Sequence, residues 1–166
     1  MENLFGLPAH PLLVHVPVVL VPLAAIGVIA MAIRPVWLRV FGPIVAALAG
    51  IGFFGAVLAA GSGEELEEKR SAAGETISKT LEEHGELGET AQWISGLFFL
   101  AVLLWVLFAW WRRRAGEEKA VAKVRKPKLV AVVLMVASVL AGAGAAVSIA
   151  AAGHNGAKAV WEGDQP

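Results

Sequence analysis

Four histidines are the side chains in this sequence whose type and position best suggest chemistry. His10 and His15 lie in AHPLLVHVP at the start of a long apolar run, His84 precedes a later apolar run, and His154 follows the last one. An ionisable side chain at the edge of a membrane-spanning run costs free energy, so it marks a candidate functional site. Neutral imidazole is a common ligand of haem iron, copper and zinc. All four are therefore candidate cofactor or metal ligands.

The composition argues against several other kinds of chemistry, among them thiolate, hydrolytic and phosphate-binding sites. The chain has no cysteine, which excludes disulfides, thiolate metal ligands, iron-sulfur clusters and c-type haem attachment within it. Its serines lack a nucleophile-elbow context, and the acidic residues in GSGEEL would repel a phosphate. Nothing in the sequence suggests nucleic-acid binding. A channel is disfavoured because the second to fourth apolar runs contain no buried charge to line a pathway.

The elements that position the histidines are predicted to be membrane-spanning helices. Hydrophobic residues make up 57% of the 166 residues and the mean hydropathy is +0.68, above the roughly 45–50% apolar content of soluble proteins. Apolar runs long enough to cross a bilayer cover residues 11–33, 36–60, 89–111 and 129–152. Backbone groups in lipid must be satisfied within each segment, so these runs are helices. We expect an all-α fold, a four-helix transmembrane bundle in a single domain, residues 1–166.

Several local features refine this expectation. The first ten residues carry Glu2 and no lysine or arginine, so the first run is expected to be a span and not a signal peptide. Pro11 suits a first helical turn, and Pro17 predicts a bend close to His15. The second span holds Gly42, Gly50, Gly52 and Gly55, which favour close helix packing over the approach of a flat cofactor. The fourth helix is predicted to end at residues 153–156, GHNG.

Residues 61–88 form a polar outer loop, and residues 112–128 form a basic cytoplasmic loop. Within the outer loop Ile77, Leu81, His84 and Leu87 follow helical spacing, as does Ala91 in the third span. This pattern predicts an amphipathic helical extension before span three, with His84 on its apolar stripe.

Charge fixes the expected orientation. Ten of the fourteen lysines and arginines follow spans one and three, whereas twelve of the fourteen carboxylates lie on the other side. Basic residues are enriched in short cytoplasmic loops, so both termini are predicted to face outward. The four histidines would then gather at the outer end of the bundle.

Three segments resemble a known family: HPLLVHVP, EEHGELGETAQW and GHNGAKAVW. They are similar to signature positions of four-span bacterial membrane proteins catalogued as domain of unknown function 2231, and the resemblance covers most of the chain. It implies a place in the bacterial cytoplasmic (inner) membrane. Members of this kind are sometimes joined to cytochrome c or Rieske modules, which implies electron transfer at the outer face.

Three functions remain open for the histidines. The first is a b-type haem protein that passes electrons between the quinone pool and an outer-face redox protein. The second is a copper or zinc site of three or four imidazoles. His10 and His15 lie about 140° apart around an ideal helix, so sharing one ion would require unwinding at His10, which Pro11 would permit. The third is a structural or assembly subunit, and homo-oligomers are compatible with each function.

The haem hypothesis predicts which histidines contribute most to haem binding. His15 and His154 are expected to lie deeper or on better-packed helix ends than His10. Replacing either by alanine should therefore weaken a haem spectrum more than His10→Ala.

Overall fold

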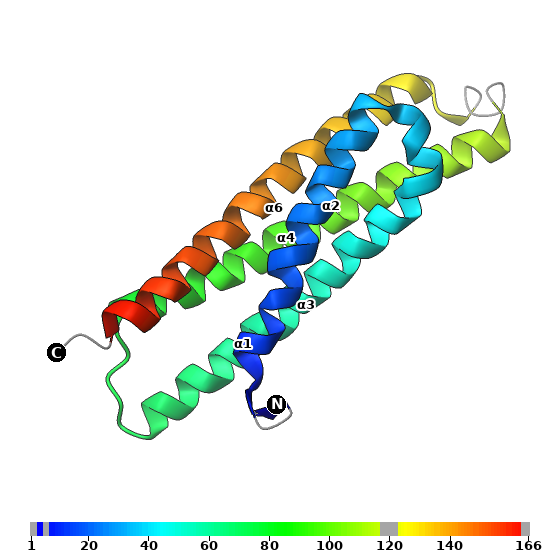
Figure 1. Ribbon diagram of the computed structural model, residues 1–166. Coiled ribbons are helices and arrows are strands. Elements are labelled where there is room, and N and C mark those ends of the chain that lie inside the picture. The colour runs from blue at the N-terminus through cyan, green and yellow to red at the C-terminus, as the bar shows by residue number, and fades with distance from the viewer. Residues whose placement is uncertain (1–2, 5–6, 117–122, 164–166) are drawn as a thin grey trace.

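The computed structural model is a bundle of four long helices (Figure 1). It describes residues 3–4, 7–116 and 123–163. A two-residue antiparallel pairing of β1 (Asn3–Leu4) with β2 (Leu7–Pro8) precedes the helices. The helical elements in chain order are α1 (Ala9–Leu13), α2 (His15–Ile33), the short 3-10 helix η1 (Pro35–Trp37), α3 (Leu38–Ala72), α4 (Lys79–Ala115) and α6 (Pro127–Gly163).

Each long helix runs antiparallel to its neighbours along the chain, and the connections alternate between the two ends of the bundle (Figure 1). Helices α2 and α4 both pack against α3 and α6. The described residues contain four helical segments long and apolar enough to cross a membrane: Ala9–Ile33, Pro35–Ala72, Lys79–Ala115 and Pro127–Trp161. The predicted all-helical protein with four apolar helices is therefore confirmed.

The core is built from side chains that fill glycine positions on the facing helix. Phe98 of α4 is fully buried, and a Cβ added at Gly142 of α6 would lie 2.8 Å from its ring. Likewise, a Cβ at Gly52 of α3 would lie 2.8 Å from Val21 of α2. Small residues let helices approach this closely in membranes, where dispersion contacts drive association. The close packing predicted for the second span is confirmed.

The first span is interrupted next to His15, where the sequence predicts a bend. Helix α1 ends at Leu13 and α2 begins at His15, with Val14 in a turn between them. Pro17 has no N–H to donate to the carbonyl of Leu13, so the helical ladder loses a bond at this point. His10 itself lies within α1, so the chain is not unwound at that residue.

The helices extend farther than the predicted spans. Helix α3 continues to Ala72 and α4 begins at Lys79, which leaves only residues 73–78 between them. Glutamate, lysine and leucine favour helix, and a Lys69–Glu65 ion pair of 3.0 Å links successive turns. Gly74, with φ of 80°, takes the left-handed conformation that ends α3.

The predicted end of the fourth helix at residues 153–156 is wrong, because α6 continues through this segment to Gly163. A glycine inside a helix costs only about 1 kcal/mol relative to alanine. The alanines on both sides and the packing of α4 against α6 outweigh this cost.

Candidate functional site

His10 lies in the short helix α1 and packs its imidazole onto α3. Its Nδ1 is 2.9 Å from the carbonyl oxygen of Ala59 and 3.3 Å from Oγ of Ser62, whose hydroxyl also donates to Ala59 at 2.8 Å. A carbonyl can only accept, so Nδ1 carries the proton. The ring is half-buried and lies beside Gly63, where an added Cβ would be 3.2 Å from Cε1.

His84 repeats this arrangement on the other half of the bundle. It lies in the second turn of α4, after Ser78 caps the helix by accepting from the backbone N–H of Leu81. Its Nδ1 donates to the carbonyl of Ala152 in α6 at 3.0 Å. A Cβ at Gly156 would lie 2.7 Å from Cε1 of His84, so only glycine leaves room for this half-buried ring.

The two histidines therefore use the same docking motif. Each donates Nδ1–H to the carbonyl of an alanine and covers the glycine four residues later, one turn along the receiving helix. Donation from Nδ1 to a backbone carbonyl fixes the tautomer and leaves the lone pair on Nε2. This is the state in which a histidine ligates a metal, and the second hydrogen bond orients the ring.

The pair lies close together across the end of the bundle. The ring centroids of His10 and His84 are 6.0 Å apart, and the ring planes are nearly perpendicular at 87°. Two imidazoles on opposite sides of one ion, each with a nitrogen about 2 Å from it, have centroids about 6 Å apart. The observed centroid distance matches this spacing, and ligation of one ion by both rings also requires each in-plane Nε2 lone pair to point at it.

His15 and His154 lie at the same end of the chain's bundle but have different surroundings. His15 is exposed, and its Nδ1 donates to the carbonyl of Pro11, one turn back in its own helical segment, at 2.6 Å. His154 is exposed on α6. Because His84 docks on Ala152 and Gly156, the side of α6 that carries His154, two residues from Ala152, is turned away by about 200°.

A metal site of three or four side chains is not assembled in the described parts of the chain. Among these residues, no group of three or more histidine, aspartate or glutamate side chains is placed to hold a metal ion. Zinc in proteins takes three or four protein ligands, which a histidine pair does not provide. Haem supplies four of the nitrogen ligands of its iron, so two histidines would complete the ligand set, and a histidine pair fits haem better than a bare zinc ion.

The sequence-based prediction did not identify the residues that hold these two imidazole rings in place. Ala59 and Ala152 contribute through their backbone carbonyls, Ser62 through its hydroxyl, and Gly63 and Gly156 through the space they leave. A signal for them exists in the small residues spaced four apart, which let another element approach a helix.

Comparison with known proteins adds the family. The family model described as "Predicted membrane protein (DUF2231)" matches residues 6–164, nearly the whole chain. Neither the curated proteins nor the solved structures include a match to this chain.

Proposed function

The chain belongs to the DUF2231 family of predicted membrane proteins, and we propose that it is a membrane-embedded b-type haem protein in which His10 and His84 would hold the haem iron. The observation that carries this assignment is the pair of imidazoles, each anchored through Nδ1 to a backbone carbonyl, with centroids 6.0 Å apart. Anchored rings need little reordering when they bind a metal, so less entropy is lost.

A glycine one turn after His84 supports the approach of a flat ring. Gly88 of α4 has no neighbouring side chain or helix within 4 Å of the position of a Cβ. It costs its helix about 1 kcal/mol relative to alanine without a packing contact in return. A porphyrin lying over backbone at this end of the bundle would account for that cost.

Bound haem would supply one-electron chemistry, which the side chains of this chain do not supply themselves. The protein's part is to hold the iron ligands on rigid helices and to keep Nε2 unprotonated through the Nδ1–H donation. Electrons would pass between the membrane quinone pool and an outer-face redox protein.

The proposal includes an orientation. The basic residues cluster at the end of the bundle opposite the histidine pair, where α2 joins α3 and α4 ends. The preference of such residues for the cytoplasm supports an outward-facing haem end in the bacterial inner membrane. In the first turns of α4, Leu81, His84 and Leu87 are half-buried while Glu82, Glu83 and Glu86 are exposed, which supports an amphipathic extension that carries His84 above the span.

Optical spectroscopy tests the assignment. Protein purified in detergent from cells supplied with haem precursor should show a Soret band and, after dithionite reduction, a sharpened pair of bands in the green region. Elemental analysis should find about one iron per chain. Colourless protein that contains stoichiometric copper or zinc would overturn haem in favour of a bare metal site. Colourless, metal-free protein would overturn both cofactor assignments and favour a structural or assembly subunit.

A further inference from the structure

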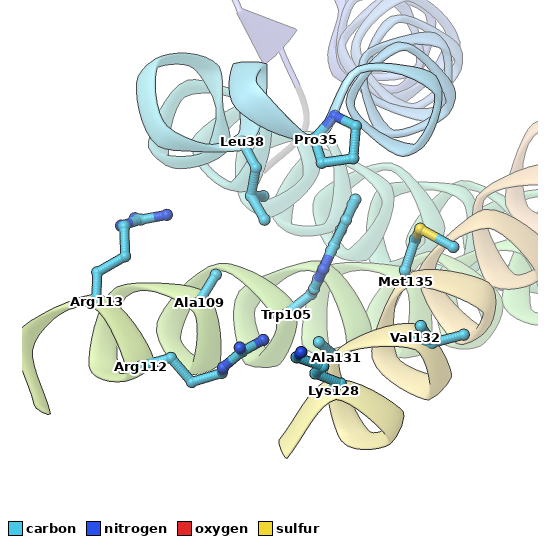
Figure 2. Close-up of a pocket in the computed structure, with 10 residues that line it drawn as sticks. All are labelled: Pro35, Leu38, Trp105, Ala109, Arg112, Arg113, Lys128, Ala131, Val132 and Met135. Atoms are coloured by element: carbon cyan, nitrogen blue, oxygen red, sulfur yellow. The ribbon is translucent and has the colours of Figure 1, made fainter. Parts of the chain in front are cut away.

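A cavity lies at the end of the bundle opposite the histidine pair. Its volume is about 450 Å³, within the range of pockets that hold small organic molecules. It is bounded by η1 and the start of α3, the last turns of α4 and the first turns of α6 (Figure 2). Ten residues line it: Pro35, Leu38, Trp105, Ala109, Arg112, Arg113, Lys128, Ala131, Val132 and Met135.

The lining combines an apolar wall with positive charge. Trp105, 3% exposed, and Leu38, 8% exposed, belong to the buried core and form the inner surface. Arg112, Arg113 and Lys128 supply three cationic groups, and none of the ten lining residues is acidic. Figure 2 shows Arg112 extending toward the first turn of α6, which carries Lys128. The positive end of the α6 helix dipole adds to their potential.

The depth of the cavity in the bilayer follows from the aromatic residues near it. Trp37 and Trp110 are partly exposed at this end of the bundle, and the guanidinium of Arg114 lies 4.5 Å from the centroid of the Trp110 ring. Tryptophans of this kind lie at the level of the lipid headgroups. The cavity therefore meets the membrane at the depth where lipid phosphates lie.

We propose that this cavity binds an anionic phospholipid, with the headgroup phosphate at Arg113 and Lys128 and the upper acyl chain against Trp105 and Leu38. Basic pockets between transmembrane helices hold anionic headgroups in this way. A small anion would leave the apolar wall uncovered. A zwitterionic lipid would bring the cationic group of its headgroup toward the three cationic side chains already present. The mixed lining thus favours an amphiphile with net negative charge.

Native mass spectrometry of the detergent-solubilised full chain tests this site, with phosphatidylglycerol and phosphatidylcholine as probes. The wild type should bind phosphatidylglycerol at least about tenfold more tightly than phosphatidylcholine. The pair Arg113→Gln/Lys128→Gln should reduce phosphatidylglycerol binding by about tenfold. The matched pair Arg125→Gln/Lys126→Gln removes the same charge from residues that do not line the cavity and should change it less than about twofold.

A second variant separates the cavity from general charge. Ala131→Trp keeps every cation but places a large ring in the cavity, and it should also weaken phosphatidylglycerol binding. Circular dichroism and the melting temperature of each variant confirm folding. Equal losses from the two charge pairs, equal binding of the two lipids, or full competition by inorganic phosphate at matched concentration would each overturn the proposal.

Discussion

The imidazoles of His10 and His84 lie with their centroids 6.0 Å apart and their planes nearly perpendicular, although they belong to opposite halves of the chain. Neither residue is held by the other. His10 is held by Ala59 of α3 and His84 by Ala152 of α6, so the spacing of the pair is set by how α1, α3, α4 and α6 pack. The site is therefore a property of the assembled bundle.

The glycine under His84 provides a matched test of ring placement. In Gly156→Ala the new Cβ would lie 2.7 Å from Cε1 of His84, so the ring must shift from its position on the carbonyl anchor. We expect this variant to lose most of its bound haem. Gly153→Ala, on the same helix, meets open space and should keep its haem and gain helix stability by up to about 1 kcal/mol. The haem-to-protein absorbance ratio of the two variants measures the difference, and equal retention would contradict the role of the His84 anchor.

The absence of cysteine from the chain makes its orientation directly measurable. Ser71→Cys and Arg125→Cys each introduce one thiol at an exposed position, near the two ends of the bundle. With the histidine end outward, a membrane-impermeant maleimide should label Ser71→Cys in spheroplasts and Arg125→Cys only after permeabilisation. The reverse pattern would place the histidine pair in the cytoplasm.

Phe98 should contribute more to stability than an equally large ring on the lipid-facing surface. It is fully buried against Gly142, whereas Phe54 is 60% exposed and lies beside the rings of Phe53 and Phe99. Phe98→Ala leaves a cavity and should cost about 3–5 kcal/mol. Phe54→Ala should cost under about 1.5 kcal/mol, because lipid replaces much of its contact. Unfolding in mixed micelles measures both losses, and similar values would show that the core is not where the buried residues indicate.

Much of the fold follows from the sequence because the apolar runs are long and uninterrupted. Four helices, the break next to His15 and the close packing around the glycines of α3 were all predictable from composition and proline chemistry. The extension of α6 beyond Gly153 was not, since it depends on contacts with α4 that local sequence does not specify.

The pairing of the histidines depends on tertiary register. The sequence indicates that all four lie at one end, but the direction of each ring depends on which helix receives it. His154 is turned away because α4 docks on the Ala152–Gly156 face of α6. His15 donates within its own helical segment. The proposed pair, His10 and His84, therefore differs from the expected ranking, in which His15 and His154 outweigh His10.

Haem content of four single variants tests that assignment most directly. His10→Ala, His84→Ala, His15→Ala and His154→Ala are purified in parallel, with size-exclusion profiles and melting temperatures to establish that each is folded. The haem-to-protein ratio should fall to near zero in His10→Ala and His84→Ala and stay close to the wild-type value in His15→Ala and His154→Ala. Retention of haem by folded His10→Ala and His84→Ala, or its loss from His15→Ala or His154→Ala alone, would contradict ligation by the pair.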